Sequence, residues 1–187
     1  MNHKGTRIIE TERLILRPFT MADAEPMYRN WASDPVVTKF LTWPAHSSTQ
    51  VSEKVLESWC VQNEDIENYQ WAIVLKEINE PIGSIAVVKL NNDIESADIG
   101  YCVGQSWWGQ KIMPEALTAV IDFLFNEVGL NRIAACHDVN NPNSGRVMQK
   151  AGMIYEGTWR AAGRNNIGVV DEVWYSILKD EYVKVED

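Results

Sequence analysis

The stretch from residue 107 to residue 116 constrains the fold more than any other, because it joins an apolar run to an apolar helical pattern. It reads Trp-Trp-Gly-Gln-Lys-Ile-Met-Pro-Glu-Ala and follows the predicted strand 97–103. The first backbone N–H groups of a helix have no intrahelical partner, and the helix dipole favours negative charge beside them. A strand, a turn and a helix in this order therefore predict an anion-binding site at the turn.

The composition is that of one soluble globular domain. The chain has 187 residues, of which 45% are hydrophobic and 23% are charged, enough to bury a sizeable core. We assign residues 1–187 to one domain, in which residues 1–4 are expected to form a loose N-terminal lead. Cys60, Cys102 and Cys136 are widely spaced and odd in number. We therefore expect free thiols and no metal site.

The charge and hydropathy patterns exclude two classes of partner. The net charge is −9, whereas binding to the phosphate backbone of nucleic acid depends on Lys and Arg. No apolar run approaches membrane-spanning length, and residues 1–17 lack a signal-peptide pattern. We expect a cytoplasmic protein with no nucleic-acid and no membrane partner. The acidity mildly favours an amine-bearing substrate, although acidic chains are commonly just soluble ones.

The first half of the chain predicts a strand, two helices and a meander of three strands. The strand covers 13–17. Thr20 and Asp23 both offer a cap for the first helix, and Asp23 is preferred because it leaves Pro26 in the first turn. The second helix is expected to open at Ser47 in a capping box with Gln50. Its expected buried face carries Val51, Val55 and Trp59. The three strands are predicted over 71–75, 82–90 and 97–103.

The second half predicts a long helix and a β-α-β-β ending. The helix runs from Pro114 to Val128 and is ended by Gly129 in a left-handed conformation. A strand over 132–139, a short helix from Pro142 to Gly152, and strands over 153–162 and 169–178 complete the chain. The order βααβββαβαββ predicts an α+β fold with one helix crossing between strands.

Four segments carry a resemblance to a known family. Residues 141–153 read Asn-Pro-Asn-Ser-Gly-Arg-Val-Met-Gln-Lys-Ala-Gly-Met, and 11–18, 97–101 and 107–116 occur in matching order. Together they resemble the GNAT N-acetyltransferases, especially their RimJ/RimL-like branch. The resemblance implies an α+β GNAT fold, a mixed central sheet flanked by helices, in which the fourth and fifth strands splay apart to admit acetyl-CoA.

The resemblance also implies which residues bind the cofactor. Amides of the turn before the central helix would hold the pyrophosphate, and the main-chain N–H of Cys102 or Val103 would polarise the thioester carbonyl. The cofactor-binding residues expected on this basis are Tyr101, Cys102, Val103, Trp108, Gly109, Gln110, Lys111, Ile112, Met113, Asn141, Asn143, Ser144 and Arg146. The chain departs from the family pattern in having Ser106 and Lys111 at the two ends of the cradle. The Lys111 side chain could obstruct the phosphates or attract them.

Asp98 and Ser144 are the expected catalytic residues. A primary amine is mostly protonated at neutral pH, so a carboxylate would help to deliver the free base. Asp98 is the first choice for this base, with Glu95 and Glu156 in reserve, although a carboxylate pairing at a strand start is an equally good reading. Ser144 would donate a hydrogen bond to the departing thiolate, or would only satisfy a backbone donor in the first helical turn.

Four other residues with reactive side chains are less favoured for a catalytic role. Tyr101 and Tyr175 could act as phenolic acids, although core packing is the commoner role for such tyrosines. Cys102 raises the question of an acyl-cysteine route, but direct transfer is the family's usual route and no histidine partner is evident. For His137 we expect an ordinary, hydrogen-bonded strand histidine.

Three functions remain in view. The first is N-acetyl transfer from acetyl-CoA directly to a primary amine, on a protein N-terminus or a small molecule, through a tetrahedral intermediate. The second is a non-catalytic acyl-CoA-binding or regulatory module on the same scaffold. A nucleotide-binding α/β protein is disfavoured, because no phosphate-binding glycine motif is present. Trp31, Trp43 and Trp159 are expected to wall the acceptor pocket, and the chain is expected to be a monomer or homodimer.

Overall fold

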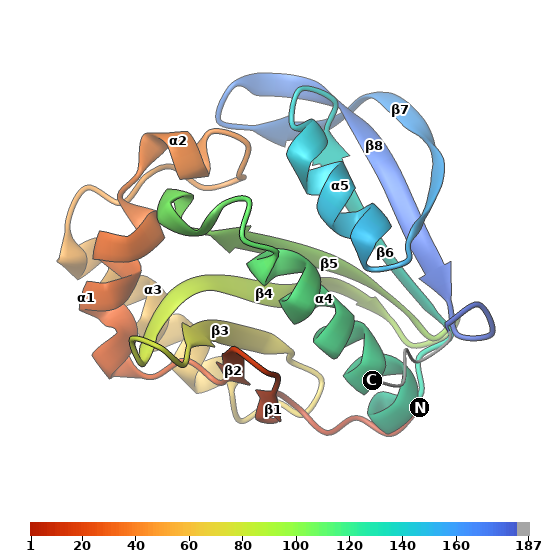
Figure 1. Ribbon diagram of the computed structural model, residues 1–187, viewed down its shortest axis with the longest axis horizontal. Coiled ribbons are helices and arrows are strands. Elements are labelled where there is room, and N and C mark those ends of the chain that lie inside the picture. The colour runs from red at the N-terminus through yellow and green to blue at the C-terminus, as the bar shows by residue number, and fades with distance from the viewer. Residues whose placement is uncertain (183–187) are drawn as a thin grey trace.

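The computed structural model describes residues 1–182 and shows a curved sheet of eight strands with helices on both faces (Figure 1). The strands lie side by side in the order β1-β2-β3-β4-β5-β6-β8-β7. Their bounds are β1 Ile9–Glu10, β2 Leu14–Arg17, β3 Gln70–Leu75, β4 Glu80–Asn91, β5 Ser96–Val103, β6 Arg132–Asp138, β7 Ile154–Asn165 and β8 Gly168–Leu178. The helices are α1 Ala24–Met27, α2 Pro35–Thr38, α3 Thr49–Gln62, α4 Ile112–Phe123 and α5 Pro142–Lys150.

The predicted α+β fold is confirmed, and so is the splay in its sheet. All neighbouring strands are antiparallel except β5 and β6, which the crossover helix α4 connects in parallel. These two strands share three residue pairs, ending with Asp98 opposite Ala134. Beyond that point they diverge into a wedge, with α4 and α5 on one side of it (Figure 1).

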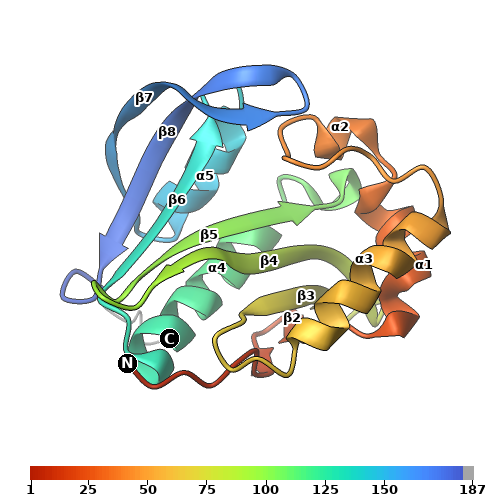
Figure 2. The same cartoon turned by 180° about the vertical axis from the view of Figure 1, so that it is seen from behind.

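Two apolar clusters hold the sheet between its layers. The larger lies under α4 and α5 and contains Trp71, Ile99 and Ile133 from alternate positions of the strands. The smaller lies under α1 and α3 and contains Ala72 and Val74 from the opposite face of β3. Figure 2 shows that α1 and α3 cover only the part of this second face near β3 and β4. No helix of the described residues covers the second face of β6, β8 and β7.

The predicted apolar face of the long helix and its end at Gly129 are both confirmed. Leu117, Val120 and Ile121 of α4 are buried in the larger cluster. The helix continues through a π-helical turn, Leu124–Val128, and Gly129 follows with φ 86°. Its start differs slightly, since Ile112 is its first residue and Pro114 its third. No helix among residues 1–182 is both long and apolar enough to cross a membrane.

The first helical segment begins earlier than predicted. Asp23 is the N-cap residue of α1, as preferred, but its side chain caps no N–H of α1, and a 3-10 turn, Met21–Asp23, capped by Thr20 precedes the helix. Asp23 accepts a hydrogen bond from the Thr20 backbone N–H instead, and both of its oxygens accept hydrogen bonds from the Arg17 guanidinium at 2.7 Å. Because Asp23 is bound to the strand before the turn, the helical turns start earlier.

Helix α3 begins one residue later than predicted, after Ser48 rather than Ser47. The buried positions shift with it. Ser52 and Leu56 are fully buried, whereas the predicted residues Val55 and Trp59 pack at the margin of the cluster.

Sequence reasoning also missed β1 and the short helix α2. In the N-terminal lead, Asn2 donates its backbone N–H to Val128 O at 2.7 Å and the His3 ring lies 2.9 Å from the Tyr69 hydroxyl. These partners lie more than sixty residues away, so no local pattern reveals them.

Candidate active site

A cavity of about 340 Å³ occupies the wedge between β5 and the α4 and α5 layer. Its walls come from the loop after α2, the end of β5, the turn before α4, and the first turns of α5. The lining residues are Val37, Phe40, Leu41, Tyr101, Cys102, Val103, Trp107, Trp108, Gly109, Lys111, Ile112, Met113, Pro114, Asn141, Asn143, Ser144, Arg146, Val147 and Lys150. Of the residues expected to bind the cofactor, only Gln110 is outside this set.

Gln110 lies in the turn but outside the cavity lining. Its side-chain amide donates to Ser106 O at 2.8 Å, and its own carbonyl accepts a hydrogen bond from the Arg13 guanidinium at 2.9 Å. Gln110 therefore shapes the turn through these contacts, and its main-chain N–H remains available to a ligand.

The turn before α4 presents a run of unpaired backbone donors. Among the described residues, the N–H groups of the five residues 109–113 donate to no protein acceptor. Gly109 has φ 76°, and a side chain there would meet only open space. Five such donors at a helix N-terminus form an anion cradle, so this turn fits the diphosphate of acetyl-CoA.

Lys111 is the residue at which this cradle departs from the family pattern. It precedes the first residue of α4 with φ 62°, a left-handed conformation that glycine adopts at lower cost. Its exposed side chain lines the cavity beside the free amides. Lys111 thus adds a positive charge to the wall of the cavity and strains the backbone of the turn.

Tyr101 and Ser144 meet across the wedge. The Tyr101 hydroxyl lies 3.0 Å from Ser144 Oγ and donates to Ser144 O at 3.0 Å. Burial raises the pKa of Tyr101 far above its ordinary value, which the hydrogen bond with Ser144 only partly offsets. The phenol therefore keeps its proton at neutral pH, and the pair holds two O–H groups inside the cavity, each donating within the pair.

Cys102 is poorly suited to be a nucleophile. Its sulfur lies 3.4 Å from Ser84 Oγ and packs against the cluster under α1 and α3. Burial raises the pKa of this thiol, against the opposing effect of its hydrogen bonds with Ser84. Since the thiolate is the reactive form, the environment of Cys102 disfavours an acyl-cysteine route.

Asp98 lies outside the first cavity, on the opposite face of β5. It lines a second cavity, of about 350 Å³, between the starts of β5 and β6 and the start of β7. Burial raises the pKa of Asp98, and the nearby charges of Lys89 and Arg132 lower it in part. Among the described residues Asp98 makes no hydrogen bond or ion pair with a side chain, which leaves its carboxylate available.

The two reserve carboxylates have partners. Glu156 accepts hydrogen bonds from two guanidinium nitrogens of Arg132 and from the hydroxyl of Ser176. Glu95 is in an exposed turn and lies 3.5 Å from the N-terminal amine of Met1. Their contacts fit structural roles, so Asp98 remains the better candidate for a base.

Two further side chains match the packing roles considered for them. The His137 ring bonds to Asp138 O at 2.7 Å through Nδ1 and stacks on Tyr175. The Tyr175 hydroxyl accepts a hydrogen bond from Gln149 Nε2 at 3.3 Å, on the α5 side of the sheet.

The tryptophans expected around the acceptor separate into different environments. Trp31 is fully buried in the cluster under α1 and α3, so it lines neither cavity and that prediction is wrong. The Trp43 ring packs against the His46 ring in the loop after α2, tilted at 46° to it. Trp159 alone of the three lines the second cavity.

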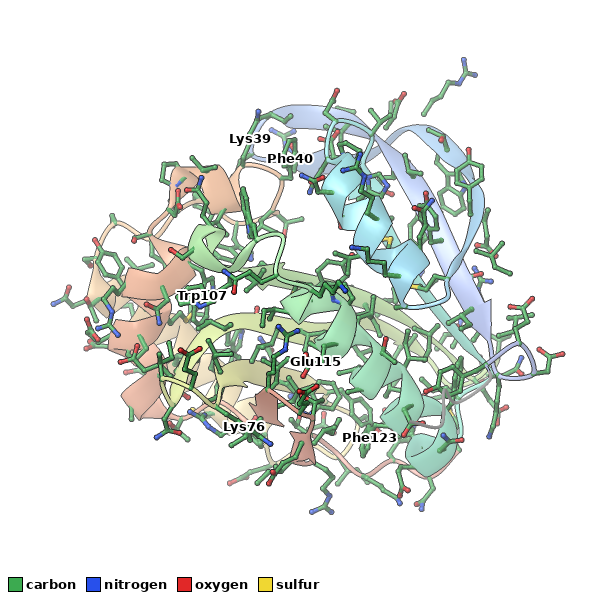
Figure 3. The ribbon with its side chains drawn as sticks, in the orientation of Figure 1. Lys39, Phe40, Lys76, Trp107, Glu115 and Phe123 are labelled. Carbon is green, nitrogen blue, oxygen red and sulfur yellow. The ribbon has the colours of Figure 1, made fainter. Side chains whose placement is uncertain are left out.

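A contact between distant segments, which the sequence did not reveal, joins the turn between β7 and β8 to the end of α2 and the loop after it. The Asn166 side chain, at the turn between β7 and β8, donates to Thr38 O and Trp43 O at 2.8 and 2.7 Å. Its backbone N–H donates to Leu41 O at 3.2 Å. Phe40, from the same loop, and Trp107, from the turn after β5, both line the cavity (Figure 3).

Comparison with known proteins gives one family. The model described as "Acetyltransferase (GNAT) domain" matches residues 13–154. A protein of Bacillus licheniformis named "Uncharacterized N-acetyltransferase p20" is 28% identical over 92% of this chain and 96% of its own. The ribosomal-protein-serine acetyltransferase of Escherichia coli is 25% identical over 91% of this chain and 95% of its own.

A solved structure shows the same fold. The structure of RimL, described as a ribosomal L7/L12 alpha-N-protein acetyltransferase in complex with coenzyme A, superposes with a TM-score of 0.83. The match covers 94% of this chain and 100% of RimL, at 20% identity.

Proposed function

The chain belongs to the GNAT acetyltransferase family, and from this premise we propose that it transfers an acetyl group from acetyl-CoA directly to a primary amine. The observation that carries the proposal is the wedge cavity, which has free amides at one end and the Tyr101–Ser144 pair inside it. Acetyl-CoA supplies the thioester whose carbonyl carbon the amine attacks.

The donor would be held by the cradle and by both walls of the wedge. The N–H groups of residues 109–113 fit the diphosphate, and the Lys111 ammonium adds attraction for the same charges. Beyond Asp98, β5 no longer pairs with β6. Main-chain groups on that edge are therefore free to bind the pantetheine arm, and the N–H of Cys102 or Val103 would stabilise charge on the thioester oxygen.

Tyr101 and Ser144 would act on the sulfur side. A departing thiolate needs a hydrogen-bond donor or a proton, and the phenol of Tyr101 remains protonated at neutral pH. Ser144 Oγ, 3.0 Å away, positions the phenol, and one of the two O–H groups would turn from its present acceptor toward the sulfur as the thiolate leaves.

Asp98 would act on the amine side. Its carboxylate lies on the other face of β5, at the point where β5 and β6 part. From there it can take the proton that the amine loses as the new C–N bond forms and the C–S bond breaks. Burial without an ion-pair partner raises the pKa of Asp98 and makes it a stronger base.

The test is release of free CoA thiol by purified protein with acetyl-CoA and a panel of amines. The panel should include peptides with free N-termini, because one relative is named for ribosomal-protein acetylation. Thiol release that depends on the amine, with the matching mass gain on the amine, supports the proposal. Binding of acetyl-CoA with no thiol release for any amine would support a binding module instead.

A further inference from the structure

The second face of β5, β6, β8 and β7 carries a cavity that the donor does not need. Within residues 1–182 no helix covers this face of β6, β8 and β7 or the start of β5 (Figure 2), and the cavity of about 350 Å³ lies on it at the closed end of the wedge. Its size is at the lower end of the range for small-molecule sites. Asp98, the one candidate base with a free carboxylate, forms part of its wall.

Strand pairing fixes which side chains share this face. Asp98 of β5 lies opposite Ala134 of β6, which lies opposite Ser176 of β8. Two residues further along β6, Cys136 lies opposite Trp174 of β8. Since directly paired residues point to the same side of a sheet, Asp98, Cys136 and Trp174 all face the bare side.

The second cavity lies close to the donor cavity. The carboxylate of Asp98 contributes to the raised pKa of Cys136, after burial and Glu172, and Cys136 in turn contributes to that of Tyr101, after burial. Asp98, in the wall of the second cavity, and Tyr101, in the wall of the first, are only three residues apart on the same strand, β5. Between Asp98 and Tyr101 the chain has Gly100 and Ile99, and Gly100 places no side chain on the bare face.

An aromatic wall forms the outer side of this cavity. Trp159 is 58% exposed, although exposure of so large an apolar ring is uncommon in a folded protein. Its ring lies 5.0 Å from that of Trp174, centroid to centroid, at 32°. Trp174 is fixed in turn, because its indole N–H donates to Glu172 Oε2 at 3.2 Å. The wall is thus a rigid ring with a second, accessible ring against it.

The polar groups of the cavity leave one carboxylate free for an amine. Arg132 and Glu156 also line it, but they are paired with each other through two hydrogen bonds. Lys89 is exposed at the rim. A ligand with an amine at Asp98 and a flat apolar body toward Trp159 would satisfy both the free carboxylate and the exposed ring.

We propose that this cavity binds the body of the acceptor and that Trp159 selects small amines whose body carries an aromatic ring. The inference rests on the proposed acetyl transfer and names the class of acceptor for it. Asp98 contacts the amine, and the ring stacks on Trp159 two or three bonds away.

The test compares three amines of matched reactivity: 2-phenylethylamine, 2-cyclohexylethylamine and propylamine. With the native protein we expect the lowest KM for 2-phenylethylamine. Trp159→Ala should raise that KM about five- to tenfold, the range expected for a lost aromatic contact, and should leave the KM for propylamine within about twofold. Trp159→Phe should restore most of the difference, because it keeps a ring.

Tyr155→Ala is the matched control. Tyr155 is on the same strand and is 55% exposed, but it packs against Tyr175 on the α5 side of the sheet. Tyr155→Ala should change none of the three KM values.

A binding measurement adds a readout that is independent of turnover. Titration of the CoA-bound protein with 2-phenylethylamine should quench tryptophan fluorescence, and Trp159→Ala should remove most of that change.

The outcomes separate this inference from the proposed function. Thiol release with all three amines, but with KM values that Trp159→Ala does not alter, would overturn the aromatic selection and leave acetyl transfer intact. No thiol release with any amine, in a protein that binds acetyl-CoA, would overturn the proposed function. Equal KM values for 2-phenylethylamine and 2-cyclohexylethylamine would show simple apolar burial and contradict a role for ring stacking.

Discussion

The Tyr101 hydroxyl lies 3.0 Å from both the side-chain and the main-chain oxygen of Ser144. The contact joins β5 to α5 at a point where β5 has already parted from β6. It therefore holds two O–H groups inside a cavity where strand pairing no longer determines the spacing.

Removing either hydroxyl should slow acetyl transfer more than it weakens donor binding. We expect Ser144→Ala and Tyr101→Phe each to lower kcat by about 10² or less, the lower end of the range for proton donors. The Kd for acetyl-CoA should stay within about threefold. If the two hydroxyls act as one unit, the double variant should be little slower than the slower single variant. Unchanged turnover in both single variants would remove the pair from the chemistry.

Asp98 should leave a signature in the pH dependence of the rate. Burial raises the pKa of Asp98, with Lys89 and Arg132 lowering it in part, and only the ionised carboxylate can accept a proton. The rate should therefore fall as the pH drops through a value above the ordinary pKa of aspartate. Asp98→Asn should lower kcat and abolish that acid limb. Lys89→Met should move the limb to higher pH, because the lowering charge is gone.

Stability provides the control for the Asp98 variant. A raised folded-state pKa stabilises the protein below the unfolded pKa, and this contribution is lost as the pH rises through the folded value. At pH 7 native Asp98 therefore contributes no such stabilisation, and Asp98→Asn should melt at the same temperature or higher. A clear fall in the melting temperature would mean that the loss of rate reports unfolding.

Lys111 combines a binding contribution with strain, and two substitutions separate them. Lys111→Gly relieves the left-handed conformation and should raise the free energy of unfolding by about 1 kcal/mol or leave it unchanged. Lys111→Met keeps the strain and removes only the charge. Both should raise the Kd for CoA about three- to tenfold at low salt and less at high salt. Tighter binding by Lys111→Gly would show instead that the side chain obstructs the cradle.

Glu115 should make stability depend on pH. This residue of α4 (Figure 3) accepts hydrogen bonds from Thr11 Oγ1 at 2.5 Å and from Arg13 Nε at 2.7 Å. Burial alone would raise the pKa of Glu115, but these bonds outweigh burial and lower it. Its contribution is therefore present above the unfolded pKa and is lost as the pH falls through the folded value.

Glu115→Gln should cost about 2 kcal/mol of unfolding free energy at pH 7, since it weakens a charged, partly buried hydrogen-bond network. The difference from the native protein should disappear in acid. Glu127→Gln is the control, because that exposed residue pairs with Lys4 on the surface and should cost less than about 0.5 kcal/mol. Equal losses in the two variants would contradict the role given to Glu115.

Local patterns in the sequence predict the fold and the donor end of the site. The strand alternation around Trp71, the stripe of α4 and its stop at Gly129 each depend on residues within one element. The cradle is also local, since a turn and the helix after it form it. The expected cofactor residues line one cavity for this reason, apart from Gln110, whose side chain bends back to Ser106.

The proposed acceptor end depends on contacts across the chain and could not be predicted in the same way. Asn166 binds the loop after α2 across more than 120 residues, and nothing near it in sequence indicates that contact. The second cavity forms because β7 returns beside β8 and brings Trp159 toward Asp98. The sequence does not show that Trp31 is buried and Trp159 exposed, because that difference depends on how the elements pack.

Because only three residue pairs join β5 to β6, hydrogen exchange of the remaining β5 amides can show whether a ligand occupies the wedge. Alternate amides of a strand point toward each of its two edges, so those on the inner edge beyond Asp98 have no neighbouring strand to protect them. They should exchange with deuterium quickly in the free protein and slowly once a ligand lies along that edge. Local exchange rates could therefore rank donors without any chemical label or turnover.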